Sequence, residues 1–235
     1  MAYNVGMKKI VLKSEFVYLG AIVLLSFAVA MITTTNMGLS MIVAPAFILS
    51  EKVSFLTFGQ AEYVVQFILF ILLCLLLRQF KLSFFFSFIT GVIYGFVLDG
   101  WRVLIPHFRP EMQGLLPLWL RLIYFVAGML LTCLSIVLFF KTYLYPQVYD
   151  FFVKIVSGRF HLDRGKFKRI FDASFFALSL IMTFLLFGKL VGVGWGTLVM
   201  TVLNGIIIGF IDRQFDRFFV CEPIFKKFAR QFPQE

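Results

Sequence analysis

Charged residues are scarce in this 235-residue chain: only 14% are Asp, Glu, Lys or Arg, against about 25% in an ordinary soluble domain. That shortage, with 61% hydrophobic residues, argues against both a soluble globular domain and a disordered chain. Three cysteines are too few for a small fold held together by disulfides. The composition therefore indicates an integral membrane protein, in which 33 phenylalanines supply much of the apolar surface.

Signatures of catalysis and metal binding are also missing. The sequence contains no Gly-x-Ser-x-Gly, no phosphate-binding lysine loop and no His-Glu-x-x-His motif. The two histidines, His107 and His161, have no second His or Cys at metal-ligand spacing. We therefore expect no enzymatic activity, no catalytic residue, no metal site and no cofactor.

Six hydrophobic segments approach the length of about 20 residues that a membrane-spanning helix needs. They are predicted at residues 16–33, 61–77, 82–98, 116–140, 171–187 and 194–211. Two shorter segments, 41–49 and 145–156, are too short or too polar to span, and we expect each to be a re-entrant or interfacial helix. The fold class is thus an all-α polytopic protein, with residues 1–235 forming a single transmembrane domain.

The distribution of the net charge of +10 indicates an orientation. With a cytoplasmic N-terminus, most of the 22 Lys and Arg residues lie on the inside, and the outer segments hold only Lys52, Arg102, Arg109 and Lys189. We therefore expect both termini in the cytoplasm and residues 216–235 to form a basic cytoplasmic tail. Attraction to an anionic leaflet accounts for the positive charge without a nucleic-acid partner.

Two halves of the sequence resemble each other, which predicts an internal repeat of residues 15–105 and 116–215. The best match aligns the motif Thr-Gly-(x3)-Gly-Phe at residues 90–96 with Asn-Gly-(x3)-Gly-Phe at residues 204–210. Each half holds three spans, and an odd number inverts the second half relative to the first. We therefore expect two inverted three-helix repeats, an arrangement found in many transporters.

Polar residues form a stripe along the third span and a matching stripe along the sixth. The stripe residues are Ser83, Ser87, Thr90, Thr197, Thr201 and Asn204, and the glycines beside them are Gly91, Gly95, Gly205 and Gly209. The glycines are expected to let helices approach closely. The stripes have two open interpretations: helix packing alone, or a polar solute path where the third and sixth spans meet.

Three further polar residues lie within spans, near helix ends: Glu62, Gln66 and Asp172. Ionisable groups inside a membrane are costly and often functional. The alternative is that these side chains reach back to the membrane surface from the helix ends.

Several short motifs resemble those of the YczE/YitT-like bacterial inner-membrane proteins. They are Asn36-Met37-Gly38-Leu39-Ser40, Thr57-Phe58-Gly59-Gln60, and Gly192-Val193-Gly194-Trp195-Gly196-Thr197 followed by Asn204-Gly205-(x3)-Gly209. The similarity covers about residues 15–215. It implies a location in the bacterial inner membrane, and it implies no catalytic residue.

Three functions fit these expectations. The first is a permease for a small solute, which predicts a polar cavity near the middle of the membrane. The second is a non-transporting accessory protein, and the third is a solute-capturing subunit of a multi-component importer. The expected partners are the lipid bilayer, a small-molecule solute, and either a second copy of the chain or another membrane protein.

Overall fold

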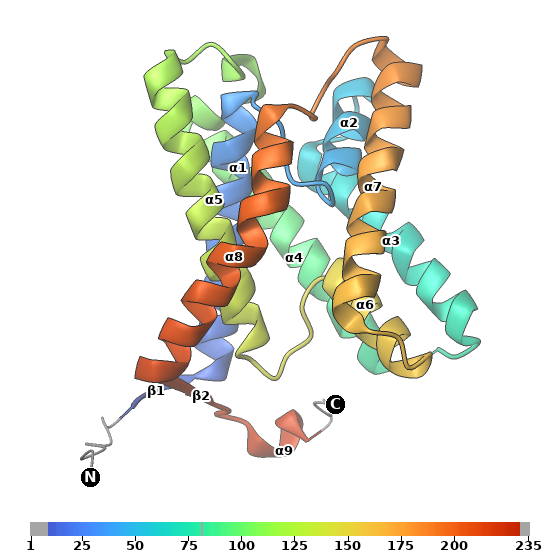
Figure 1. Ribbon diagram of the computed structural model, residues 1–235, viewed down its shortest axis with the longest axis vertical. Helices are drawn as coiled ribbons and strands as arrows, with labels where there is room; N and C mark the ends of the chain where they lie inside the picture. The colour runs from blue at the N-terminus through green and yellow to red at the C-terminus, as the bar shows by residue number, and fades with distance from the viewer. Residues whose placement is uncertain (1–8, 81, 231–235) are drawn as a thin grey trace.

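The computed structural model describes residues 9–80 and 82–230, apart from the side chains at 82, 83 and 228. It is helical except for one pair of short strands (Figure 1). Among the described residues, six helices are long and apolar enough to cross a membrane. They are α1 (Ser14–Thr35), α3 (Phe58–Leu77), α4 (Leu82–Leu104), α5 (Leu118–Phe140), α7 (Arg164–Phe187) and α8 (Trp195–Phe218). The predicted fold class of six membrane helices is confirmed.

Three helices extend well beyond the spans predicted from hydrophobicity. The third span was predicted to end at 98, but α4 continues to Leu104. The fifth was predicted at 171–187, but α7 begins at Arg164, where Asp163 caps it by accepting from the Lys166 N–H at 2.6 Å. The sixth was predicted to end at 211, but α8 continues to Phe218. Charged residues end the apolar segment without ending the helix, because Lys and Arg are good helix formers.

Each of the two short segments forms a short helix that begins inside the bundle. They are α2 (Ala44–Lys52), which follows α1, and α6 (Val148–Arg159), which follows α5. In Figure 1 the chain turns back into the molecule after α1 and after α5 before each short helix starts. The two helices then run toward opposite ends of the bundle. The buried residues of both helices lie mostly toward their starts, as a re-entrant helix would need, and the choice between a re-entrant and an interfacial helix stays a prediction.

The helices pack in pairs that correspond between the two halves. The central pair is α1 with α5, and α4 packs on α1 much as α8 packs on α5. Similarly, α2 packs on α3 and α7, while α6 packs on α7 and α3. One pair breaks the correspondence: α3 and α4 pack closely, whereas the described parts of α7 and α8 are splayed apart (Figure 1). Two equivalent halves would give this pairing, but the inverted repeat itself stays a prediction.

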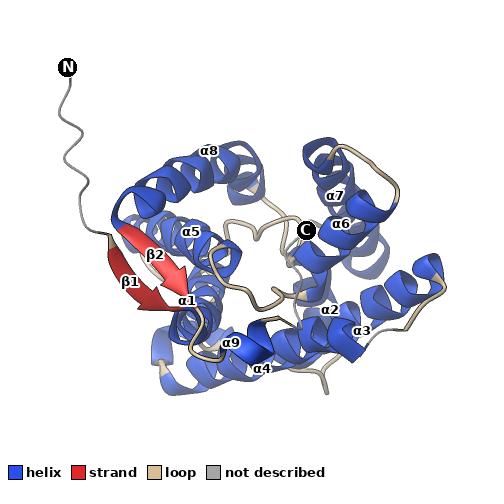
Figure 2. Cartoon of the chain, turned by 90° about the horizontal axis from the view of Figure 1, so that it is seen from below, coloured by secondary structure: helices blue, strands red, loops and turns tan. Residues whose placement is uncertain are grey.

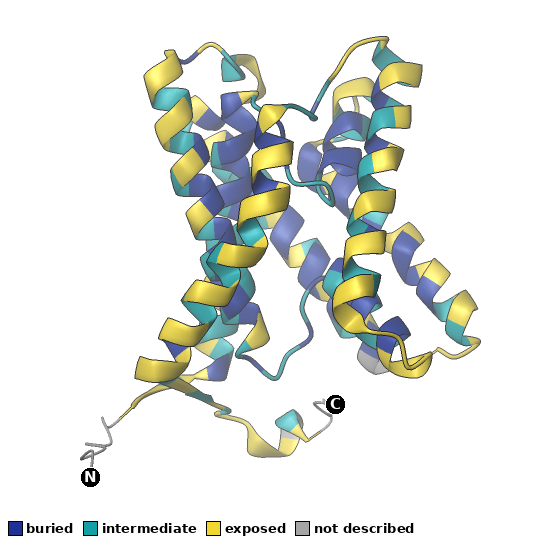
Figure 3. Ribbon diagram, viewed as in Figure 1, coloured by how far each residue is buried: buried dark blue, intermediate teal, exposed yellow. Residues whose placement is uncertain are grey.

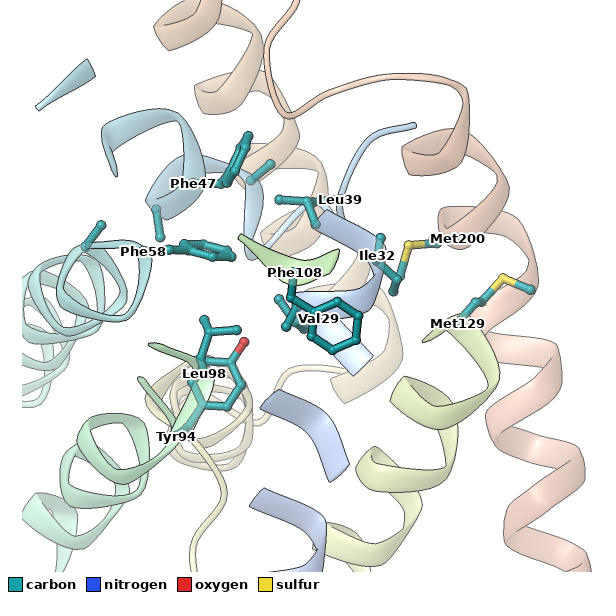
Figure 4. Packing of buried hydrophobic residues seen from close by; sticks show 14 of the residues in the cluster. Val29, Ile32, Leu39, Phe47, Phe58, Tyr94, Leu98, Phe108, Met129 and Met200 are labelled. Atoms are coloured by element: carbon teal, nitrogen blue, oxygen red, sulfur yellow. The ribbon is translucent and has the colours of Figure 1, made fainter. Parts of the chain in front are cut away.

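The hydrophobic core lies around α1 and α5. In each of these two helices, 44% of the hydrophobic 18-residue stretch that could span a membrane is buried. The corresponding share is 17% in α7 and in α8. Figure 3 shows that most of α7 and α8 is exposed, as expected of helices that face lipid. Figure 4 shows core side chains converging from α1, α2, α3, α4, α5 and α8, among them Phe47, Phe58, Tyr94 and Met200.

Both described ends of the chain lie at one end of the bundle. Strand β1 (Ile10–Lys13) pairs in parallel with β2 (Phe219–Glu222), and the short helix α9 (Lys226–Ala229) follows (Figure 2). The Glu15 carboxylate accepts hydrogen bonds from the N–H groups of Ile224 and Phe225 at 2.9 and 3.1 Å. The α4–α5 connection at the opposite end contains the 3₁₀ turns η1 (Pro106–Phe108) and η2 (Pro110–Met112).

Candidate functional site

Two loops from different halves of the chain, residues 36–43 and 188–194, pack against each other just before α2 and α8. The Leu39 N–H donates to the Gly192 carbonyl at 2.9 Å, and the Gly196 N–H donates to the Met37 carbonyl at 2.7 Å. Gly38 has φ +105°, and a Cβ there would lie 2.5 Å from Thr197 Oγ1. Only glycine fits this contact, because both the backbone conformation and the space exclude a side chain.

Close packing of α3 against α4 positions the next part of the site. A Cβ on Gly91 would overlap the amide of Gln66, and one on Gly95 would overlap the ring of Tyr63. The Gly59 N–H donates to Asp99 Oδ1 at 2.9 Å and links the two helices near the start of α3. Gly91 and Gly95 thus lie where the two helices approach most closely, and they leave room for the polar side chains of α3.

Glu62 and Gln66 form a fully buried polar cluster with the start of α6. Glu62 Oε2 accepts from the Tyr149 hydroxyl at 2.9 Å and from Gln66 Nε2 at 3.2 Å. Gln66 Nε2 also lies 3.3 Å from Gln147 Oε1, and Gln66 Oε1 accepts from the Val148 N–H at 3.4 Å. The interpretation that Glu62 and Gln66 reach back to the membrane surface is therefore wrong.

Beside this cluster lies a cavity of about 80 Å³. Apolar side chains of α1, α5 and α8 form much of its wall, and Figure 4 shows several of them, including Val29, Ile32 and Met200. The loop before α2 and the start of α6 complete it. Its polar lining residues are Ser40, Tyr94, Thr132, Gln147, Tyr149 and Asp150.

Three polar groups at the cavity have no hydrogen-bond partner among the residues that the structure describes. They are the Tyr94 hydroxyl, Thr132 Oγ1 and Gln147 Nε2, and their residues are only 1%, 6% and 8% exposed. A buried polar group without a partner costs about 1–3 kcal/mol, so such groups usually meet water or a ligand. The cavity has room for more than one water molecule or for a small solute.

A larger, open space of about 650 Å³, here called the vestibule, adjoins the cavity. The segment from Phe139 to Pro146 forms one wall, and α8 contributes Gly205, Gly209 and Asp212. The cavity and the vestibule share Phe139, Pro146 and Asp150 as lining residues. The vestibule therefore leads from the end of the bundle that carries β1 and β2 toward the cavity.

Ion pairs surround the vestibule. Lys168 Nζ lies 3.1 Å from Asp150 and 3.0 Å from Asp172, so Asp172 takes part in a charge pair beside the vestibule. Lys141, just after α5, pairs with Asp212 at 2.8 Å and with a second aspartate one turn further along α8. Burial alone would lower the pKa of Lys141, but its hydrogen bonds and attraction to these two aspartates raise the pKa above its ordinary value.

The polar stripes of the third and sixth spans do not meet, so the predicted solute path between them is wrong. Among the described residues, α4 packs mainly on α3 and α1, whereas α8 packs on α5. On α4, Ser87 Oγ donates to the Phe84 carbonyl at 2.7 Å. Thr90 Oγ1 contacts the Tyr18 hydroxyl and lies 3.1 Å from the Tyr145 carbonyl. The side chain of Ser83 lies outside the described residues.

On α8 the stripe residues make local or packing contacts. Thr197 Oγ1 accepts from the Gly194 N–H at 3.2 Å, and Thr201 donates to the Thr197 carbonyl at 2.7 Å. Asn204 Oδ1 accepts from Cys133 Sγ of α5 at 3.5 Å. These contacts place Thr197 and Asn204 where α8 meets its neighbours, outside the cavity wall.

Gly205 and Gly209 do not have the packing role predicted for them. A Cβ at either position would meet nothing within 4 Å among the described atoms. The reason is the splay of α7 from α8, which leaves this face of α8 without a neighbouring helix. Both glycines line the vestibule instead, and a larger side chain at either position would reduce its volume.

Comparison with known proteins identifies one family. The model of a family of unknown function (DUF6198) matches residues 12–213 of the chain. No curated protein and no solved structure matches it. The matched range includes all six membrane helices except the last residues of α8, and it includes every residue of the cavity.

Proposed function

We propose that this chain, which belongs to the DUF6198 family, is a permease that carries a small solute across a membrane through the cavity. The observation that supports the proposal most is the set of three buried polar groups that line the cavity and have no partner among the described residues. Most buried polar groups in proteins have a hydrogen-bond partner, and these three belong to residues that line one cavity. A polar solute in the cavity would give these three groups hydrogen-bond partners.

The re-entrant helices support the same function. In secondary transporters, the solute site lies near the middle of the membrane where interrupted helices begin. Here α2 and α6 both begin at the cavity, and the vestibule adjoins the cavity through their shared lining residues. The accessory-protein alternative has no comparable support, because it gives the cavity no role. Reconstitution distinguishes a permease from a solute-capturing subunit, because the subunit alone would bind solute but would not carry it across the membrane.

We place the protein in the bacterial inner membrane with both termini in the cytoplasm, on the positive-inside distribution of Lys and Arg. The vestibule opens toward the end that carries the termini, so the conformation is open to the cytoplasm. The motifs of the two packed loops, at residues 36–40 and 192–197, favour assignment to the YczE/YitT-like group. We propose no enzymatic activity and no nucleic-acid partner; the lipid bilayer is the main partner, with a second copy or another membrane protein as a further one.

The proposal is tested by uptake into proteoliposomes. A panel of labelled small solutes, covering anions, cations and neutral molecules, is offered to wild-type protein and to Tyr94→Phe, which removes only the unpartnered hydroxyl. We expect at least one solute to enter, and we expect Tyr94→Phe to reduce its uptake by about tenfold, the effect of losing one buried hydrogen bond to the solute. Tyr124→Phe is the matched control, because the Tyr124 hydroxyl contacts His107 at the surface, away from the cavity.

Two outcomes would contradict the permease. If no solute in the panel enters although the protein is folded, the transport function is wrong. If a solute enters and Tyr94→Phe carries it as fast as wild type, the cavity is not the route. Loss of uptake in the Tyr124→Phe control would show that removal of any tyrosine hydroxyl perturbs the protein, and the cavity assignment would then lose its support.

A further inference from the structure

The positive ends of two helices point at the cavity. Helix α2 has nine residues and α6 has twelve, and neither begins with a side-chain cap. Their starts contribute Val43 and Gln147 to the cavity wall. The start of a helix carries a partial positive charge that favours an anion. The Val148 N–H of α6 already donates to Gln66 Oε1 at 3.4 Å and the Ala44 N–H of α2 to the Ser40 carbonyl at 3.0 Å, so the contribution of these two ends is that of the helix dipole. Two such ends at one cavity of about 80 Å³ favour negative charge inside it.

The unpartnered side chains point to the same kind of ligand. Gln147 Nε2 can only donate hydrogen bonds, and the hydroxyls of Tyr94 and Thr132 can donate as well. All three residues are more than nine-tenths buried. A ligand that satisfies them must offer acceptor atoms, as nitrate, chloride and carboxylates do. The lining residues include no Lys, Arg or His, so the site offers only partial charges and suits a monovalent anion.

Two acidic residues near the cavity decide whether an anion can stay there. Asp150 lines the cavity, but its charge is paired with Lys168 at 3.1 Å. Glu62 lies one hydrogen bond behind the wall, through Tyr149, and makes no ion pair among the described residues. An anion beside an ionised Glu62 would be repelled strongly, since a buried site screens charge poorly. The repulsion disappears if Glu62 carries a proton.

Among the described residues no Lys, Arg or His offsets a negative charge on Glu62, which is favoured by the start of α6 and by the donors Tyr149 and Gln66. From α6 the facing titratable group is Tyr149, and from α4 it is Tyr94, with Asp99 further along the same helix. The buried residues of α2, which packs on α3, are all apolar. A buried carboxyl in such surroundings is least costly in its protonated form.

We propose that the cavity binds one small monovalent anion together with one proton, and that Glu62 carries the proton. The inference rests on the proposed permease and gives its solute class. In transport, anion and proton would move together, so one negative and one positive charge cross and no net charge is transferred. No covalent bond forms or breaks except the O–H bond of the Glu62 carboxyl.

The first test needs no variant. Purified wild-type protein in detergent is titrated with formate and with formamide, which has nearly the same size and shape but no charge, and binding is measured by calorimetry. We expect formate to bind at least about tenfold more tightly. Equal affinity would overturn the anion site, as would failure of formate, nitrate and chloride all to bind.

The second test follows the proton. Nitrate binding is measured from about pH 5.5 to about pH 8.5, because nitrate takes up no proton of its own in this range. If one proton binds with the anion, the affinity falls by up to about tenfold per pH unit as the pH rises. Glu62→Gln keeps an acceptor for Tyr149 and needs no proton, so we expect it to bind nitrate with no such pH dependence. Persistence of the wild-type pH dependence in Glu62→Gln would overturn the role of Glu62.

The inference and the permease fail in different ways. Uptake of a neutral or cationic solute that Tyr94→Phe abolishes would overturn the anion site and leave the permease standing. Binding of formate and nitrate without uptake of either into proteoliposomes would overturn the permease. It would leave a solute-capturing anion site.

Discussion

Gly38 packs against Gly194 and Thr197 so closely that the methyl group of an alanine at position 38 would disturb the contact. We expect Gly38→Ala to lower the free energy of unfolding by about 1–3 kcal/mol, because alanine resists φ +105° and its Cβ would lie 2.5 Å from Thr197 Oγ1. The control is Gly20→Ala on the exposed face of α1, where a Cβ would meet nothing within 4 Å among the described atoms. Thermal unfolding in detergent measures both variants.

We expect Gly20→Ala to be neutral or slightly stabilising, since alanine favours a helix by up to about 1 kcal/mol over glycine. If Gly38→Ala unfolds at the same temperature as Gly20→Ala, then the loop contact is not a fixed part of the fold. The account of how the two loops before α2 and α8 pack together would have to be abandoned in that case.

Single residues of the site differ in how readily the sequence reveals them. Glu62 and Gln66 are conspicuous, since ionisable and amide groups stand out in an apolar span. The sequence does not show that their side chains point into the protein, because their partners lie at the start of α6. Tyr94 and Thr132 give no signal, because one hydroxyl on each of two separate helices is ordinary in a membrane protein. Gln147 lies at the edge of an amphipathic segment, where a polar residue is expected anyway. Only the tertiary fold brings these three groups together.

At the scale of helices, hydrophobicity predicted every membrane span and both short helices. It could not predict that α4, α7 and α8 extend beyond their predicted apolar spans, because helix propensity continues where hydrophobicity ends. Nor could it predict which helices become neighbours: the match between the third and sixth spans was interpreted as contact, whereas α4 packs on α1 and α8 on α5. Similar sequences on two helices indicate similar positions in two halves, which is different from contact between them.

The vestibule gives a prediction for one face of α8. After replacement of the three native cysteines by alanine, we expect Gly209→Cys to react readily with a water-soluble thiol reagent applied from the side proposed to be cytoplasmic. Gly209 lines the vestibule, and a thiol must be ionised in water to react. The control is Phe210→Cys, because Phe210 is 56% exposed but does not line the vestibule, and we expect it to face lipid.

We expect Phe210→Cys to react at least about tenfold more slowly, since a lipid-facing thiol stays protonated. Labelling is followed as the mass increase of the purified protein. Similar rates at the two positions would show that water does not fill the vestibule selectively, and the access route to the cavity would then be wrong.

The whole molecule carries a prediction about topology. The described ends of the chain lie at one end of the bundle, and the α4–α5 connection lies at the other (Figure 1). We expect a reporter enzyme that is active only outside the cytoplasm to be inactive when fused after Glu235. Inserted beside the exposed Glu111 of η2, the same reporter should be active. The reverse pattern would invert the orientation, and activity at both positions would contradict the count of six spans.

The central claim is that the cavity holds a solute, and Thr132→Val tests it most directly. Valine has the shape of threonine without the hydroxyl, and Thr132 Oγ1 has no partner among the described residues. If the hydroxyl only lines an unused space, its removal should stabilise the protein and leave function unchanged. Thr34→Val is the control, because Thr34 is equally buried but donates to the Ala30 carbonyl at 3.1 Å.

The measurement is solute uptake per folded molecule in proteoliposomes, with thermal unfolding of the same preparations. The account predicts that Thr132→Val unfolds at the same or a higher temperature than wild type and takes up solute about tenfold more slowly. It predicts the reverse for Thr34→Val: lower stability and normal uptake per folded molecule. Wild-type uptake by a stable Thr132→Val protein would contradict the claim that solute passes through the cavity.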